Sequence, residues 1–303
     1  MLRTELHCHN VYSNGHVGDL EPPFDCNVSI SEQLEKSLES NLDVLFVTNH
    51  NTLDGFNQIT DYKNDHEKFS NLKIFPAEEI TTDKEAHVLV YGLHEEIKSN
   101  QTLDEIIDAA KSQDAITIAP HPFSLIDALR DDSLKCDLFE VFNSSNIDIY
   151  SNKKAEIFAK EKNLLTTAGS DSHIASTIGR CTNLIDSQNN LDDVIHAMKK
   201  GKISIEKTEY VTHREVLEHI QYKIENSKEY IDQYIQEFYP KYFWLFNQMY
   251  KSYMFTKKSF VWRAVFKIAL FGLRRISYKI NFEGYDPYAF RTRDIPTMTK
   301  MIF

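Results

Sequence analysis

Short apolar runs recur through the first two thirds of the chain, separated by longer polar stretches. Most of these runs are continuous rather than alternating, a pattern typical of strands that are covered on both faces, as in parallel sheets. The run LDVLFVTNH is the clearest, because it is rich in β-branched and aromatic residues. The runs that predict strands span residues 3–9, 42–50, 72–80, 86–92, 114–121, 137–143 and 163–170.

Helical patterns lie between most of these runs. A helix is predicted over residues 29–40 with Ser29 or Ser31 as its N-cap, and Thr102 with Glu105 forms a capping-box pattern before another helix. Further helical patterns cover residues 150–162 and 190–200. Strands that alternate with helices predict an α/β fold with a parallel sheet or barrel, here with about seven strands.

The chain changes character after this alternation, which predicts a barrel domain over residues 1–205 and a helical extension over residues 206–303. Residues 214–239 predict a helix of mixed charge, and residues 242–280 are aromatic and basic. Within the latter, an apolar face is formed by Val261, Val265, Ile268, Phe271 and Leu273. The basic residues that interrupt it are Arg263, Lys267, Arg274 and Arg275.

Composition and charge sharpen this division. Hydrophobic residues make up 42% and charged residues 26% of the 303, as in an ordinary globular protein. The net charge of −11 combines +9 over residues 241–303 with −20 over residues 1–240. The acidic part does not suit long nucleic acid, which is bound largely through Lys and Arg. The basic segment predicts packing on the barrel, self-association, contact with an anionic membrane, or contact with nucleic acid.

The chain carries no sign of secretion. Its four cysteines form no Cys-x-x-Cys pair and no disulfide framework, which favours a reducing compartment. The first ten residues lack the apolar core of a signal peptide, and no run reaches about 18 apolar residues. We therefore expect a cytoplasmic protein, and the basic segment would allow a peripheral position at the inner membrane surface.

Candidate metal ligands sit at the predicted strands. His7 and His9 are two apart, so on a strand they face the same side. His50 follows the apolar run VLFV after Thr48 and Asn49. Glu79 is the residue of Glu78-Glu79 that we expect to point inward, where its carboxylate could bridge two cations.

The second half of the barrel sequence supplies four more candidates. His87 opens an apolar strand, His121 lies between two prolines, and Asp171 and His173 follow a strand and a glycine in GSDSH. Each motif alone is better explained by polar residues at strand ends. Together, however, six of the twelve histidines fall at predicted strand ends before residue 174. A set of His, Glu and Asp without Cys predicts a catalytic site for divalent ions, either Zn²⁺, Mn²⁺ or Fe²⁺, rather than a closed structural zinc site.

In this order, the motifs H-x-H, T-x-H-x-T, A-x-E, a histidine before an apolar strand, P-H-P and S-D-x-H resemble the PHP (polymerase and histidinol phosphatase) superfamily. The resemblance covers roughly residues 1–205 and is strongest to small metal-dependent phosphoesterases. It implies a distorted seven-stranded TIM-like β/α barrel.

The resemblance also implies an assignment of ligands to three metals. The first metal would be held by His7, His9, Glu79 and Asp171. Glu79 would bridge to a second metal that His87 and His121 also bind. A third metal would be held by His50 and His173. By the same resemblance, the catalytic residues would be Glu79, Asp171 and His173.

The sequence departs from the family pattern around the third metal. Where relatives commonly place Asp or His just after the first block, this chain has Asn14, with His16 as an alternative ligand. Asn49 and Asn51 also stand where Asp is common.

The function implied is hydrolysis of a small phosphorylated substrate, either a phosphomonoester or a nucleotide, with Arg180 as a candidate phosphate-binding residue. Two alternatives stay open. One is a nuclease acting on short or single-stranded ends, and the other is a metal-binding regulatory protein without turnover.

Overall fold

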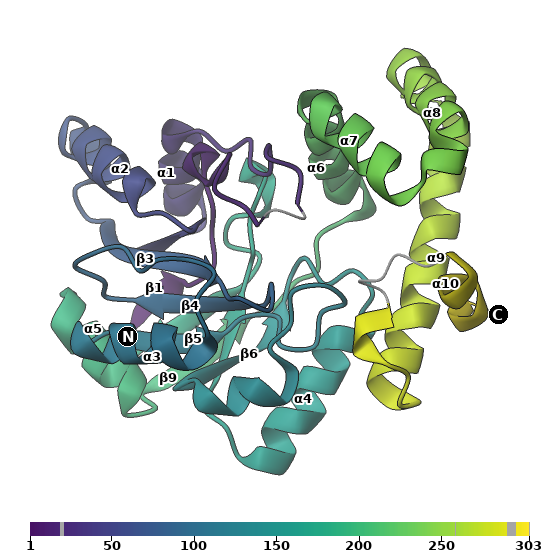
Figure 1. The fold of residues 1–303 in the computed structure, drawn as a ribbon. Coiled ribbons are helices and arrows are strands. Elements are labelled where there is room, and N and C mark those ends of the chain that lie inside the picture. The colour runs from purple at the N-terminus through teal and green to yellow at the C-terminus, as the bar shows by residue number, and fades with distance from the viewer. Residues whose placement is uncertain (19–20, 258, 290–294, 303) are drawn as a thin grey trace.

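The computed structural model describes residues 1–18, 21–257, 259–289 and 295–302. Within them, one nine-stranded sheet runs in the order β7-β6-β5-β4-β3-β2-β1-β8-β9 (Figure 1). The strands are β1 (Leu2–Glu5), β2 (Val44–His50), β3 (Lys73–Thr81), β4 (His87–Tyr91), β5 (Ile116–Ala119), β6 (Leu138–Asn143), β7 (Thr166–Gly169), β8 (Thr182–Ile185) and β9 (Ile203–Lys207). The predicted α/β barrel class is confirmed.

The sheet is mixed, whereas the apolar runs had suggested a parallel one. Strands β1, β2 and β3 are parallel, as are β5, β6 and β7, but β4 is antiparallel to both of its neighbours. The connection from Thr81 to His87 is too short for the crossover that a parallel pair needs. Strand β4 therefore starts at the end of the sheet where β3 finishes.

Two strands, β8 and β9, were not predicted. Strand β8 has only four residues, and β9 is an edge strand with alternating exposure. Neither forms the continuous apolar run by which the other strands were recognised. Both are antiparallel to their neighbours, and β9 ends at Lys207.

The sheet curls until β7 lies against β8 and β9, so the barrel is nearly closed. The Asn183 side chain on β8 bridges the gap between β7 and β8 by hydrogen bonding to the backbone of Ala168 on β7. Its Oδ1 accepts from the Ala168 N–H at 3.0 Å, and its Nδ2 donates to the Ala168 carbonyl at 2.7 Å. Asn183 is fully buried. Its two hydrogen bonds take the place of backbone–backbone hydrogen bonds between the strands.

Helices fill most of the connections between strands. The barrel helices are α1 (Ile30–Glu39), α2 (Asp54–Asn64), α3 (Leu103–Ser112), α4 (Tyr150–Lys162) and α5 (Leu191–Lys199). Thr102 caps α3 through the predicted capping box with Glu105. Of the two candidate N-caps of α1, Ser29 is the one used, and it forms a capping box with Glu32 that was not predicted.

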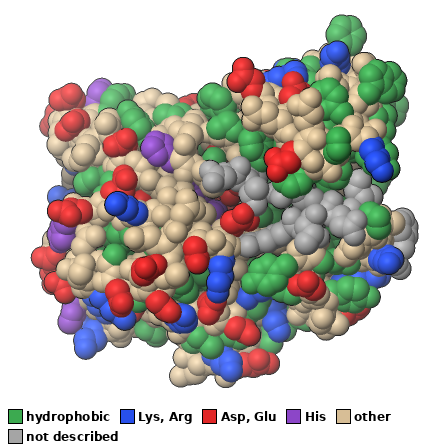
Figure 2. Space-filling model, viewed as in Figure 1, with side chains coloured by type: hydrophobic (Ala, Val, Ile, Leu, Met, Phe, Trp, Pro, Cys, Tyr) green, Lys and Arg blue, Asp and Glu red, His purple; other side chains and the backbone are tan. Residues whose placement is uncertain are grey.

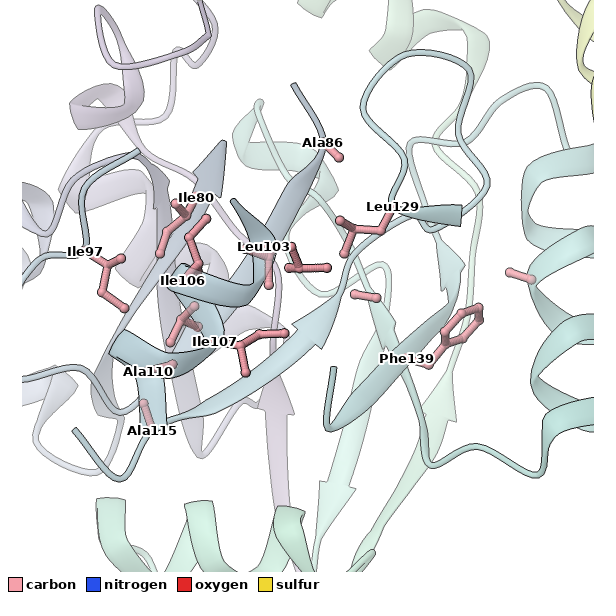
Figure 3. Close-up of a cluster of buried hydrophobic side chains, with 14 of the residues drawn as sticks. Ile80, Ala86, Ile97, Leu103, Ile106, Ile107, Ala110, Ala115, Leu129 and Phe139 are labelled. Carbon is pink, nitrogen blue, oxygen red and sulfur yellow. The ribbon is translucent and has the colours of Figure 1, made fainter. Parts of the chain in front are cut away.

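Apolar side chains of α3 pack against the sheet to form one of the buried clusters (Figure 3). Ile106 and Ile107 of α3 lie in this cluster together with Ile80 of β3 and Phe139 of β6. Each such burial stabilises the fold by roughly 1.5–3 kcal/mol. The cluster fixes the strands whose ends carry the candidate ligands.

Among its described residues, the C-terminal extension forms five α-helices beside the barrel (Figure 1). They are α6 (His213–Asn226), α7 (Lys228–Phe238), α8 (Phe243–Thr256), α9 (Phe260–Phe282) and α10 (Ile295–Ile302). The helix predicted over residues 214–239 is therefore two helices, which divide at Ser227, and the aromatic segment is also divided. None of the described helices combines the length and apolarity that crossing a membrane requires.

We expect Asn183→Ala to lower the free energy of unfolding by about 2–4 kcal/mol, because two backbone groups of Ala168 lose their buried partner. Urea denaturation monitored by circular dichroism measures this. Asn64→Ala, at an exposed helix end, is the control and should change stability little. Equal stability of the two variants would contradict the closure role.

Candidate metal centre

The candidate ligands meet at one end of the barrel because of the strand directions. His50 is the last residue of β2, Glu79 lies near the end of β3, and Asp171 follows β7 by two residues. His87 is the first residue of β4, yet it joins them, since antiparallel pairing sets it opposite Thr81 at the end of β3.

Two of these side chains sit on strained backbone. His121 has φ of 29° and Asp171 has φ of 50°, both in the region that favours glycine. Hydrogen bonds hold them there: the His121 N–H donates to Glu140 Oε2 at 2.7 Å, and the Asp171 N–H donates to the His7 carbonyl at 2.8 Å. Strain of this kind is typical of functional sites.

Glu79 lies at the centre of the cluster and faces histidines with both carboxylate oxygens. Its Oε2 is 3.2 Å from His7 Nε2, 3.2 Å from His9 Nε2 and 3.4 Å from His50 Nδ1. Its Oε1 is 3.1 Å from both His87 Nδ1 and His121 Nε2. The carboxylate thus joins two groups of imidazoles, which is the arrangement expected of a bridging ligand.

Two aspartates flank this centre. Asp171 Oδ1 lies 3.5 Å from His7 Nε2 and 3.4 Å from His9 Nε2. On the other side, Asp127 Oδ1 lies 3.3 Å from His121 Nδ1. Asp127 was not predicted, since it belongs to a loop without a strand pattern.

The electrostatics of the cluster are those of a cation site. Burial opposes a charge on Glu79, but the facing histidines, led by His7 and His87, outweigh it and hold the pKa of its carboxyl well below its usual value. Burial lowers the pKa of His9 to about 4, and His173 adds to this effect. Burial also opposes charge on His87, but Glu79 outweighs it and raises the pKa to about 9.

The donor atoms fit divalent metal ions. Bonds of about 2.1 Å set neighbouring ligand atoms roughly 3.0–3.4 Å apart in octahedral or tetrahedral geometry, close to the separations found here. Among the described residues, His9 Nε2, His50 Nδ1 and His121 Nδ1 are buried without a well-formed hydrogen bond, although carboxylate oxygens lie near. The sets whose ligand atoms lie within 4.8 Å of one another are His7, His9, Glu79 and Asp171; His50, Glu79 and His87; His87, His121 and Asp127; and His9, His50 and His173.

An outer carboxylate orients the first of these sets. Glu140 Oε1 lies 3.1 Å from His7 Nδ1, and its Oε2 accepts from Asn143 Nδ2 at 2.9 Å. Such partners fix the imidazole ring for metal binding. Glycine is required at position 169 beside them, because a Cβ there would lie 1.8 Å from Glu140 Oε1.

A further acid, Asp25, lies beside the predicted third-metal ligands. Its Oδ2 is 2.7 Å from His173 Nε2 and 3.4 Å from His50 Nε2. Asp25 is fully buried in the loop that precedes α1. Sequence reasoning missed it, because neither a strand pattern nor a recognised motif marks this loop.

Helix α6 of the extension closes over the same place. Lys223 Nζ donates to Asp25 Oδ1 at 2.5 Å, and His219 Nε2 lies 2.7 Å from the Asp25 carbonyl oxygen. The His219 ring also stacks on His173, with centroids 4.8 Å apart. Two side chains from outside the predicted barrel therefore border the cluster.

Asn14 and His16, the candidate ligands of the third metal, and the nearby Asn49 make hydrogen bonds within the protein. Asn14 Oδ1 accepts from the N–H groups of Asp25 and Cys26, so Asn14 shapes the loop that presents Asp25. His16 is exposed, and its carbonyl accepts from Asn51 Nδ2 at 2.6 Å. Asn49 Oδ1 accepts from the Asn10 N–H at 2.9 Å. The structure thus gives the asparagines backbone-bonding roles.

Arg180 lies at the edge of the site and is paired with carboxylates. Its guanidinium donates to Glu215 at 2.6 Å and to Glu209 at 3.3 Å. Glu215 in turn lines a small cavity of about 70 Å³ together with Asp171, His173 and His219. The cavity gives the cluster a free space next to two predicted catalytic residues.

Comparisons with known proteins give the family and the fold of the chain. A family model described as PHP-associated (PHP_C) matches residues 150–203. Uncharacterized protein MJ1587 of Methanocaldococcus jannaschii is 30% identical over 151 residues, covering 48% of this chain and 85% of that protein. Uncharacterized protein MJ0417 of the same organism is 33% identical over 126 residues, covering 38% of this chain and about half (53%) of that protein.

Among solved structures, PsfC from Pseudomonas syringae PB-5123 shares the fold, with a TM-score of 0.51 and 18% identity over 74% of this chain and 98% of PsfC. The chain belongs to the PHP superfamily. The family and the buried His, Glu and Asp cluster together define a candidate multi-metal centre of the PHP type.

We expect Glu79→Gln to lose bound metal, because the amide removes the charge that faces both groups of histidines. Plasma emission spectroscopy of the purified variant measures the ions per chain. Glu78→Gln is the matched control: Glu78 is also buried, but its Oε2 accepts from the Ile97 N–H at 3.2 Å. Equal metal content in the two variants would contradict a bridging role for Glu79.

Proposed function

We propose that the protein hydrolyses a small phosphomonoester or nucleotide at a site with two or three divalent ions. The observation that carries the proposal is the position of Glu79, whose two oxygens face separate groups of histidines. Two-metal phosphoesterase sites hold their ions roughly 3.5–4 Å apart, and a shared carboxylate can bridge such a distance.

The histidines and carboxylates around Glu79 would hold divalent ions, which would supply polarisation of the phosphoryl oxygens and a lower pKa for water. The chain supplies proton-handling groups beside the small cavity, namely the Asp171 carboxylate and the His173 imidazole. Their Oδ1 and Nδ1 atoms are 3.5 Å apart. We assign to this pair the acceptance of a proton from water and its delivery to the leaving oxygen.

Three features support a small substrate. The cavity beside Asp171 has a volume of only about 70 Å³, and α6 covers one side of it. Residues 1–240 carry a charge of −20, which repels a long phosphate backbone. Arg180 is the candidate to bind a phosphate group, and Glu209 and Glu215 hold its guanidinium near the cavity wall.

The donor set also bears on the metal. Imidazole nitrogens and carboxylate oxygens without thiolates suit Zn²⁺, Mn²⁺ and Fe²⁺. We propose that the ions bridged by Glu79 are held most firmly. In the third group, the carboxylate of Asp25 is already paired with the Lys223 ammonium, which offsets the charge that would attract a cation.

We expect His121→Ala to lower kcat by at least about a hundredfold, because loss of even an outer partner of a metal ligand costs roughly 10–100-fold. Phosphate release from p-nitrophenyl phosphate and a panel of nucleoside monophosphates measures this, with each of the three metals. His94→Ala, at an exposed position, should retain full activity. Failure of the metal-loaded protein to hydrolyse any of these substrates would favour a regulatory protein without turnover.

The effect of salt on the reaction rate distinguishes a nuclease from a hydrolase of small phosphomonoesters. Cleavage of short single-stranded oligonucleotides should fall steeply with added salt if the basic extension binds their backbone. Our proposal predicts phosphate release from monoesters that changes little with salt, together with no internal cleavage of oligonucleotides.

We expect Lys223→Met to increase the affinity for a third ion, because removal of the ammonium frees the Asp25 carboxylate. Isothermal titration of Mn²⁺ into the metal-free protein measures the number of sites and their affinities. Lys228→Met is a matched control, since Lys228 pairs with Asp232 on its own helix and not with the cluster. Identical titrations for Lys223→Met and the wild type would contradict the proposal that the Lys223 ammonium competes with a third metal ion for the Asp25 carboxylate.

A further inference from the structure

The first half of α9 exposes an apolar face that the described residues leave uncovered. Phe260 is 75% exposed and Ile268 is 72% exposed, and Val261, Val265 and Phe271 are also exposed. At 100° per residue these five positions fall within one arc of about 140°. A monomeric globular protein rarely leaves large side chains exposed together in this way unless something binds them.

Helix α8 adds exposed aromatic groups of the same kind. Trp244 is 73% exposed and Phe255 is 91% exposed. Figure 2 shows hydrophobic side chains gathered over the region of α8 and the upper part of α9. The exposed apolar surface is therefore a property of the two helices and not of a single residue.

An apolar hollow of about 1120 Å³ lies between α6, α7, α8 and α9. Its lining is made largely of aliphatic and aromatic side chains, among them Leu217, Phe246 and Trp262. Its charged lining residues are mostly basic, with Arg214, Lys257, Arg263 and Lys267 against Glu218. Apolar walls with excess positive charge suit an amphiphile with an anionic head.

The charge of residues 238–282 indicates which kind of partner covers the apolar surface of α8 and α9. Residues 238–282 contain nine Lys and Arg residues and no Asp or Glu. Arg263 and Lys267 are exposed one turn apart beside the apolar arc, and no carboxylate among the described residues pairs with either. Both groups are free to meet phosphate groups.

We propose that α8 and the first half of α9 form a docking surface for an anionic lipid bilayer. Trp and Phe side chains would enter the interface between headgroups and acyl chains, while Arg263 and Lys267 would bind the anionic headgroups. A second copy of the chain fits less well, because two such surfaces would repel each other. Nucleic acid would leave the aliphatic residues Val261, Val265 and Ile268 without an apolar partner.

The second half of α9 fixes this surface to the enzyme. Ile276 and Ile280 are buried against Leu125 of the barrel, and Ser277 Oγ donates to Asp148 Oδ1 at 2.6 Å. The helix is thus anchored at one end and uncovered at the other. Docking would hold the barrel at the membrane without insertion of a spanning helix.

Flotation of the full-length protein with lipid vesicles tests the proposal. The wild type should float with vesicles of phosphatidylcholine and phosphatidylglycerol, and should stay at the bottom of the gradient with phosphatidylcholine alone. Arg263→Gln combined with Lys267→Gln should weaken the partition roughly thirtyfold, since each basic residue near an anionic surface contributes about 1 kcal/mol. Phe255→Gln combined with Phe260→Gln and Ile268→Gln should abolish flotation.

A matched variant controls for the loss of exposed apolar surface elsewhere. Leu134→Gln combined with Ile157→Gln and Leu165→Gln changes three exposed residues of the barrel and should float like the wild type. Folding of every variant is checked by its thermal transition. Phosphate release from a water-soluble substrate should be unchanged, because none of these residues borders the metal cluster.

Three outcomes would overturn the proposal. The first is failure of the wild type to float with anionic vesicles. The second is flotation of the Phe255, Phe260 and Ile268 variant to the same extent as the wild type. Alternatively, light scattering would show a wild-type dimer that this variant converts to a monomer, in which case a second copy covers the face.

Discussion

A single buried carboxylate, that of Glu79, is the constraint on which the architecture of this protein depends. A charge with almost no solvent contact is costly unless cations or hydrogen-bond donors surround it. Here imidazoles from several strands face its two oxygens at 3.1–3.4 Å. Each of these histidines is itself buried, so the cluster is stable only as a unit with balanced charge, and divalent ions would supply that balance.

The barrel is built to keep this unit in place. Positive φ angles at His121 and Asp171 direct both side chains inward, and Glu140 binds the backbone of one strand end while it orients His7 on another. Asn183 closes the sheet where the backbone ladder is interrupted. These polar contacts are buried, so their cost of desolvation is offset only when all of them form together.

The extension takes part in the site and also has a surface of its own. Helix α6 brings Lys223 and His219 to Asp25, at the edge of the cluster. Further along, α8 and α9 carry apolar and basic side chains away from the barrel. The acidic barrel and the basic, apolar part of the extension thus present surfaces of opposite charge.

By itself, the sequence determined the α/β class, seven of the strands and the histidine, glutamate and aspartate set. Continuous apolar runs and capping boxes are local signals, and the motifs keep their order along the chain. It also indicated the basic, aromatic character of the extension. Strands β8 and β9 were not predicted, because short or edge strands bury too few apolar residues to form a continuous apolar run in the sequence.

Only the tertiary structure decided which residues complete the site. Asp25 and Asp127 come from loops without a pattern, and Lys223 comes from a helix far along the chain. The position of His87 depended on β4 being antiparallel, which the apolar run could not reveal. In each case the side chain acquires its function from neighbours that are distant in sequence, and such proximity arises only when the sheet curls and the extension packs against it.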